Sequence, residues 1–271
     1  MLKRIVIDLV SKHFGKYIKD LHADKLNISL WNGDVSLEEL FINTDAFEDL
    51  IVGIPLKVKE GRIAQMSLHF PWSNLEGESV VVKIKEIELV CHLDYSVDIS
   101  LINKQLKMEE MNSKQRKIRN YEMGEQKQTI GQRIMTKVIE NLLIEIENIH
   151  LTFEGINTWL NVQYVFGIDI QSILLYSTNN EWKRMFITER SLDHFKIAEI
   201  NKLNCYHYRK NAQIKKNFII ENLTTQMHLT LSDKEESFPI TSSILLSMLK
   251  MGISQHALID IKSMLQQQKL F

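Results

Sequence analysis

The stretch VVVKIKEIELVCHL, residues 80–93, alternates apolar and polar side chains in the way that predicts a β-strand with one buried face. The alternation changes phase once, because Ile84 is followed by Ile87 at a spacing of three residues instead of two. One extra residue at this point, as in a β-bulge, would keep the apolar side chains on one face. The segment therefore predicts a long, half-buried strand with an irregularity near its centre.

The same apolar–x–x–apolar step recurs along the chain. The further steps are Leu37/Leu40, Ile63/Met66, Ile146/Ile149, Ile170/Ile173, Ile197/Ile200 and Ile220/Leu223. Because a bulge raises local twist, bulges at matching heights in adjacent strands would curl a sheet in one direction. The pattern predicts a mainly β fold with flanking helices (α+β), built from about eight or nine strands in a strongly curved antiparallel sheet.

Three segments have helical spacing instead. Residues 2–21 predict an N-terminal amphipathic helix, and residues 255–270 predict a final one. Residues 98–138 predict a polar helical segment that is basic, with nine Lys/Arg and four Asp/Glu between positions 101 and 137. We further expect a short helix or turn at 44–50, with Thr44 or Asp45 as its N-cap. The expected units are residues 1–97, 98–138 and 139–271.

These helices are too few and too polar to cover the apolar face of so long a sheet. The face must therefore close on itself as a sandwich or barrel, or be filled by another molecule. The residue pattern leaves both alternatives open.

Composition excludes several classes of protein. A net charge of −1 argues against nucleic-acid binding, and 25% charged residues with 44% hydrophobic ones indicate an ordered globular chain.

Cys91 and Cys205 are too few for a disulfide framework and are interpreted as buried thiols of a reducing compartment. Eighteen consecutive apolar residues, the length of a membrane-spanning helix, occur nowhere in the sequence. We find no phosphate-binding glycine loop, nucleophile elbow or metal-ligand spacing of histidines, so we expect no enzyme, cofactor or metal.

Three motifs carry a more specific signal. They are the WNGDVSL turn (31–37), the IPLKVKEGRI hairpin (54–63) and the FPWSNL corner (70–75). Together with segments 138–154, 165–168 and 177–182, they closely resemble the N-terminal chorein domain of the vacuolar protein sorting thirteen family of bridge-like lipid transfer proteins. The sequence departs from the family pattern at Leu56, where an aromatic residue is usual, at Ser79, where proline is usual, and at Gly155, which stands in place of an acidic pair.

The resemblance implies a taco-like sheet with an open hydrophobic groove, and an N-terminal amphipathic helix at one end. It implies non-vesicular transfer of phospholipid between organelle membranes, with this chain as the membrane-proximal unit of a longer bridge. The expected cargo is glycerophospholipid. The expected partners are phospholipids, organelle membranes contacted peripherally, and membrane scramblases or adaptor proteins. The expected location is the cytoplasm at membrane contact sites, on the endoplasmic reticulum side. The expected groove-lining residues are Met66, Leu68, Ile84, Ile87, Leu89, Cys91, Ile146, Ile149, Leu151, Ile170, Ile173, Leu175, Leu223, Met227 and Leu229.

The rival interpretation comes from a different class of protein. In it the chain is a closed β-rich protein-interaction scaffold without lipid cargo, whose apolar face is entirely core and whose edge strands or basic helix bind partners.

Overall fold

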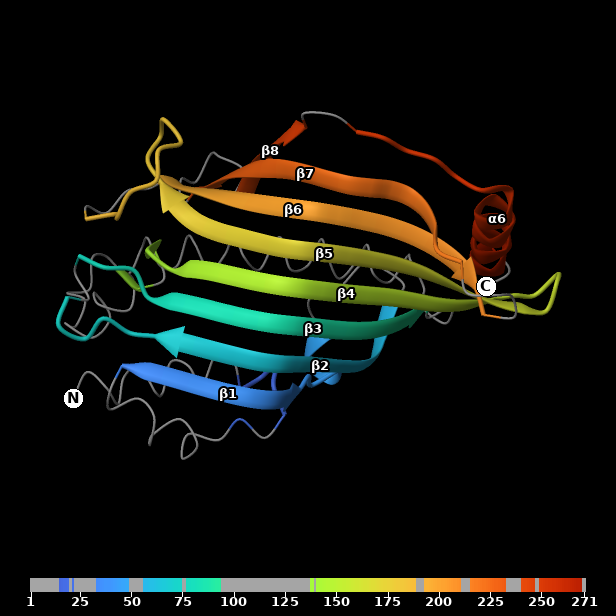
Figure 1. Cartoon of the computed structure of the whole chain (residues 1–271), viewed down its shortest axis with the longest axis horizontal. Coiled ribbons are helices and arrows are strands. Elements are labelled where there is room, and N and C mark those ends of the chain that lie inside the picture. Colours follow the sequence, from blue (N-terminus) through green and yellow to red (C-terminus); the bar gives the residue numbers. More distant parts are fainter. Residues whose placement is uncertain are drawn as a thin grey trace, which may run out of the picture.

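A computed structural model of the chain describes residues 15–19, 21, 33–48, 56–74, 77–93, 137–138, 140–188, 193–210, 215–232, 240–246 and 249–269. Their eight strands form one sheet in the order of the chain (Figure 1). The strands are β1 (Asp34–Phe41), β2 (Leu56–His69), β3 (Val81–Leu93), β4 (Leu143–Asn157), β5 (Val162–Thr178), β6 (Asp193–Arg209), β7 (Asn217–Ser232) and β8 (Ile240–Leu246). The sheet is not closed, since β1 and β8 form its two edges.

The sheet is mixed, which corrects the expectation of a fully antiparallel one. All neighbouring strands are antiparallel except β3 and β4, which run parallel with Val81 opposite Leu143 and Glu88 opposite His150. A parallel pair needs a connection that returns the chain to the same end of the sheet. Residues 94–142, which include the predicted basic segment, make this connection. The alternation of apolar and polar residues does not tell whether a neighbouring strand runs parallel or antiparallel.

The apolar–x–x–apolar steps of β1 to β5 lie at one height across the sheet, but they are not bulges in the usual sense. Glu38 pairs with Gln65 and Leu40 with Ile63, so Glu39 and Ala64 drop out of the pairing together and the register is unchanged. Each strand from β1 to β6 carries one such residue. The row is Glu39, Ala64, Glu86, Asn148, Gln171 and Lys202. Because the insertion is matched in neighbouring strands, the apolar side chains return to the same face together.

The row has a distinct backbone geometry on the strands that run in one direction. Glu39, Glu86, Asn148 and Lys202, on β1, β3, β4 and β6, have φ of 49°, 55°, 56° and 49°. This left-handed conformation is unfavourable for residues other than glycine, by about 1 kcal/mol or more. Its repetition at one height shows that the packing of the whole sheet imposes it.

One predicted step was wrong. Ile197 pairs with Tyr176 and Ile200 with Ile173, so the two isoleucines lie on opposite faces with no irregularity between them. The phase change in β6 comes at Lys202, between Ile200 and Leu203. The β6–β7 pairing does shift register there and again near Cys205.

The WNGDV motif owes its glycine to a close approach of two strand ends. Gly33 has φ of 89°, and its backbone carbonyl accepts a hydrogen bond from the Phe70 N–H at 2.7 Å. A Cβ at this position would lie 2.8 Å from the Phe70 carbonyl oxygen and 3.2 Å from Trp72. The turn before β1 and the Pro-Trp corner after β2 are therefore one packed unit, which explains why both motifs occur together.

The helices are confirmed in part. The predicted C-terminal helix is α6 (Gln255–Lys269), and Thr44 directly precedes the short helix α3 (Asp45–Glu48). Residues 15–19 form a turn with an isolated bridge between Ile18 and Ile42, so the predicted N-terminal helix does not run to residue 21. Its other residues, and most of 98–138, lie outside the described residues.

Candidate functional site

Apolar side chains of neighbouring strands line up in rows across one face of the sheet. In one row, Met66 pairs with Ile84, Ile84 with Ile146, and Ile146 with Ile173. The next row, on the far side of the matched insertions, runs Ile63, Ile87, Ile149, Ile170, Leu203 and Leu223. Directly opposed residues of adjacent strands share a face, so these rows define one continuous apolar face.

All fifteen residues expected to line a groove lie on this apolar face. Leu68 pairs with Val82, which pairs with Ile144, and Ile144 pairs with Leu175. Leu89 pairs with Leu151, and Cys91 with Phe153. On β7, Met227 pairs with Ala198 and Leu229 with Lys196. The structure thus brings the predicted set together on one surface, whereas their contact with lipid stays a prediction.

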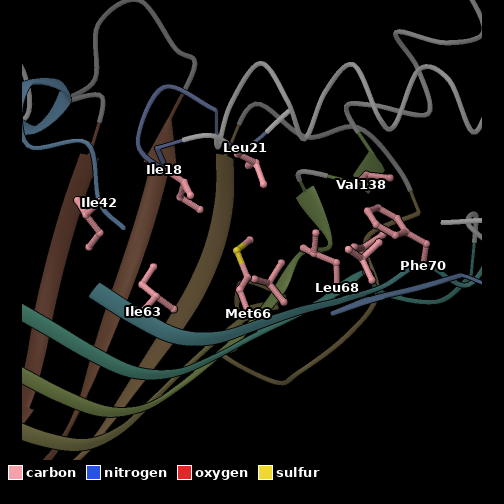
Figure 2. Close-up of a cluster of buried hydrophobic side chains, with 11 residues drawn as sticks. Ile18, Leu21, Ile42, Ile63, Met66, Leu68, Phe70 and Val138 are labelled. Atoms are coloured by element: carbon pink, nitrogen blue, oxygen red, sulfur yellow. The ribbon is translucent and has the colours of Figure 1, made fainter. Parts of the chain in front are cut away.

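The apolar face is buried at its β1–β3 end. A cluster there joins the face to residues from outside the sheet, and Figure 2 shows Ile18, Leu21 and Val138 lying over Ile63, Met66 and Leu68. Met66 and Leu68 are buried, at 1% and 2% exposure. These two predicted lining residues are therefore packed in core.

Towards β5, β6 and β7 the same face is only half-buried. Ile170, Ile173 and Leu175 on β5, with Leu223 and Met227 on β7, all fall in this class. A half-buried apolar surface of this extent on long strands is the kind of surface that binds another apolar molecule.

Over β1–β4 the opposite face is polar and charged. Lys83 and Glu145 form an ion pair at 2.7 Å across β3 and β4, and Arg62 on β2 contacts both Glu39 and Glu88. His150 lies on this face, as its alternation predicts, with its Nδ1 2.9 Å from Asp169 Oδ1. Solvent-exposed ion pairs contribute little stability, so their arrangement marks this face as the one in contact with water.

Lys196 is a residue of the apolar face that the sequence interpretation missed. It pairs with Ser177 and Leu229, and its Nζ donates hydrogen bonds to Ser177 Oγ at 2.9 Å and to the Glu140 carbonyl at 3.0 Å. Burial lowers the pKa of this amine, and the charge of Glu140 opposes that effect. The predicted step at Ile197 implied that the neighbouring Lys196 points to the opposite face. Lys196 lies two residues before Ala198 and four before Ile200, and this even spacing was the signal that could have placed it.

Helix α6 is held at the far end of the strands by a buried carboxylate. Asp260 accepts hydrogen bonds from Asn157 Nδ2 at 2.6 Å, from Arg209 Nε at 2.9 Å and from Arg209 Nη2 at 2.8 Å. The Nε2 of buried His207 lies 2.9 Å from the same carboxylate. Burial would raise the pKa of the Asp260 carboxyl, but the hydrogen bonds from Arg209 and Asn157 outweigh it and lower the pKa.

Reactive or ligand-binding groups are sparse in the part of the chain that the structure describes. Cys91 and Cys205 are free thiols, and burial raises the pKa of both. No cluster of three metal-ligating side chains occurs among the described residues. None of the helices described there has the length and apolar character needed to cross a bilayer. A cavity of about 500 Å³ lies at the β1–β3 strand ends, with Val35 and Leu68 in its lining beside polar residues such as Asp34 and Lys83.

Known proteins resemble this chain in sequence over most of its length. Residues 1–266 match the model of the VPS13-like family N-terminal region. The intermembrane lipid transfer protein VPS13 of Chaetomium thermophilum is 30% identical over 217 residues, which cover 76% of this chain and 7% of that protein. The intermembrane lipid transfer protein vps13A of Dictyostelium discoideum is 26% identical over 277 residues, covering 94% of this chain and 8% of that protein.

Human VPS13C, also an intermembrane lipid transfer protein, is 22% identical over 259 residues. This chain spans less than a tenth of the length of these curated relatives. Since the family model covers nearly all of the sequence, the chain belongs to the VPS13-like family, whose N-terminal region it matches.

Proposed function

We propose that this chain binds glycerophospholipids on its apolar face and takes part in their non-vesicular transfer between organelle membranes, as the membrane-proximal unit of a longer bridge. The observation that carries the proposal is the continuous apolar face, which is half-buried over β5–β7 on a sheet that does not close. The relatives' names, intermembrane lipid transfer proteins, support the same function. We place the protein at membrane contact sites on the endoplasmic reticulum side, with scramblases or adaptor proteins as further partners.

The physical argument rests on what each part of a lipid gains and loses. An acyl chain of about 16 carbons gains on the order of 12 kcal/mol on leaving water. In a bilayer it already has that gain, so moving to an apolar protein face is nearly neutral and removes the aqueous barrier. A phosphate head would lose several kcal/mol if buried unpaired, so we expect heads to stay in water at the rim. This partition predicts weak selectivity among head groups.

The open architecture weakens the scaffold interpretation. A closed barrel requires its first and last strands to pair, and β1 and β8 are instead separate edges of the described sheet. A sandwich requires a second sheet over the apolar face, and all described strands belong to one sheet. The scaffold remains the alternative that the first experiment tests.

The first experiment identifies co-purifying lipid. The chain is purified from cells and analysed by native and denaturing mass spectrometry. We expect several phospholipids with mixed head groups. A stable, lipid-free monomer that also refuses added fluorescent phospholipid would contradict the proposal and favour the scaffold.

A paired substitution locates the lipid on the apolar face. Leu89 and Leu151 are direct cross-strand neighbours there, so Leu89→Glu with Leu151→Glu places two carboxylates side by side in the proposed path of the acyl chains. We expect lipid occupancy to fall at least about tenfold while the chain stays folded, because burying a carboxylate against acyl chains costs several kcal/mol. Native mass spectrometry measures the occupancy and circular dichroism the fold.

The matched control lies one residue further along both strands. Val90 and Thr152 are likewise paired, but on the opposite face. Val90→Glu with Thr152→Glu therefore introduces the same charge pair in the same strands, and we expect it to keep its lipid. Equal lipid loss in both double variants would show that the effect comes from sheet damage and not from the apolar face.

A further inference from the structure

The hairpin that joins β4 to β5 ends in exposed apolar side chains. We call residues 156–161 the hairpin tip. Ile156, Trp159 and Leu160 are 51%, 52% and 49% exposed, and no charged residue occurs between positions 155 and 168. In Figure 1 this hairpin projects beyond the rest of the sheet, next to α6. Water would favour polar residues at such a projecting turn, so its apolar composition points to a binding role.

The hairpin tip is held in a fixed shape. The side-chain oxygen of Asn157 accepts hydrogen bonds from the backbone N–H groups of Trp159 and Leu160, both at 3.1 Å. The amide of the same residue donates to buried Asp260 of α6. One asparagine therefore shapes the turn and ties it to the helix, which presents Trp159 and Leu160 without the entropy cost of ordering a loose loop.

Lysines surround the base of the hairpin tip. The Lys210 N–H donates to the Gln163 carbonyl at 2.9 Å, so the end of β6 lies directly beside the start of β5. Lys59, Lys210 and Lys215 are exposed at this end of the strands, where Glu154 contacts the first two and exposed Glu60 directly follows Lys59. Lys59 and Lys210 both lie within 4 Å of the Glu154 carboxylate, and their contacts lower its pKa. Among these described residues, three lysines stand against two carboxylates, which leaves positive charge around an apolar tip.

We propose that the hairpin tip is a membrane-docking element, in which Trp159 and Leu160 insert into the interface of an anionic bilayer while the neighbouring lysines bind its phosphate groups. Tryptophan prefers the membrane–water interface, because its ring is apolar and its N–H can hydrogen-bond to head groups. Each lysine near an anionic surface adds about 1 kcal/mol of attraction. The turn is too short to span a bilayer, so the docking is peripheral.

The location gives the docking a role in the proposed transfer. The hairpin tip lies at one end of the strands, where the apolar row of Phe153, Phe166 and His207 meets α6. Docking there would bring the rim of the apolar face to the membrane surface, where phospholipids enter or leave. This role rests on the proposed function, whereas the docking itself does not.

The experiment measures binding of the whole chain to vesicles by co-sedimentation. One set of vesicles contains phosphatidylcholine with phosphatidylserine and the other phosphatidylcholine alone. We expect binding to the anionic set, and a loss of about tenfold or more in the partition coefficient for Trp159→Ser with Leu160→Ser. Lys210→Gln should weaken it about fivefold. Trp159→Phe should keep most of the binding, because an aromatic ring remains.

Met185→Ser is the control for removing an exposed apolar side chain such as that of Leu160. Met185 is 44% exposed, close to the value for Leu160, but it follows β5 at the opposite end of the strands. We expect Met185→Ser to bind vesicles like the unchanged chain. Binding of the double variant at the unchanged level would overturn the proposal. Absence of binding by the unchanged chain would also overturn it, and would leave a protein as the partner of the tip.

Lipid occupancy separates this inference from the proposed function. The double variant should retain its co-purified lipid by native mass spectrometry, since neither side chain belongs to the predicted lining set. An unchanged chain that binds vesicles through the tip yet never carries lipid would refute the proposed function and leave the docking intact.

Discussion

At the residue scale, His207 and Asp260 make the docking of α6 sensitive to acid. Burial lowers the pKa of His207 and outweighs the opposing effect of Asp260, so folding favours the neutral imidazole. As the pH falls below about 6.5, the unfolded chain takes up this proton first. The stability that the neutral imidazole contributes is therefore complete above that pH and is lost as the pH falls towards the lowered pKa. The lowered pKa of Asp260 adds a second loss below its ordinary value of 3.8.

We expect the urea midpoint of unfolding to fall as the pH is lowered from about 7 to about 5. His207→Gln should flatten this dependence, because an amide can donate to Asp260 but does not titrate. Asp260→Ala should cost about 3 kcal/mol or more, since it leaves half-buried Arg209 and buried Asn157 without their carboxylate. An unaltered pH dependence in His207→Gln would exclude this histidine as its source.

At the element scale, the sequence predicts the strands better than their pairing. Alternation finds each long strand, and the step at Ile84/Ile87 marks the height of the irregularity, because both depend on local burial. The sequence of one strand does not show that the extra residues Glu86 and Asn148 are matched, because the match depends on how β3 and β4 pair. The parallel pairing of β3 and β4 depends in the same way on a distant connection. Lys196 shows the cost of one wrong phase, because the predicted step at Ile197 implied the wrong face for this half-buried amine.

The left-handed residues of the matched row give a test at this scale. Glu86 has φ of 55° in the middle of β3 and is exposed. We expect Glu86→Gly to leave stability unchanged or raise it by up to about 1 kcal/mol, because glycine adopts this conformation freely. Glu86→Val should cost about 1–2 kcal/mol, since a β-branched residue is strained there. Urea unfolding gives both values.

The control for Glu86 is Glu88, two residues along the same strand and paired with Arg62 in the ordinary register. Valine suits a regular strand, so Glu88→Val should be close to neutral, apart from the weak ion pair that it loses. If valine were tolerated equally at both positions, the left-handed row would not be a feature of the folded sheet.

At the scale of the whole molecule, an open sheet has two edges. The composition of β8 makes its edge the one that pairs more readily with a further strand. The strand ITSSILL has no charged residue and no proline, and Ile244, Leu245 and Leu246 are about half exposed. Natural edge strands usually carry such protective residues, because unpaired backbone groups beside apolar side chains recruit further strands. The apolar rows also continue onto β8, since Met227 pairs with Ile244. An added strand would therefore extend both the ladder and the apolar face.

We expect the chain to self-associate as its concentration rises, and Leu245→Lys to shift this association to at least about tenfold higher concentration by placing a charge on the edge. Sedimentation velocity at increasing concentration measures the effect. Leu258→Lys on α6 is the control, because Leu258 is 43% exposed but lies away from the sheet edge. Equal suppression by both lysines would point to general charge repulsion instead of strand pairing. Suppression by Leu245→Lys alone would identify β8 as the edge where a further strand adds to this sheet.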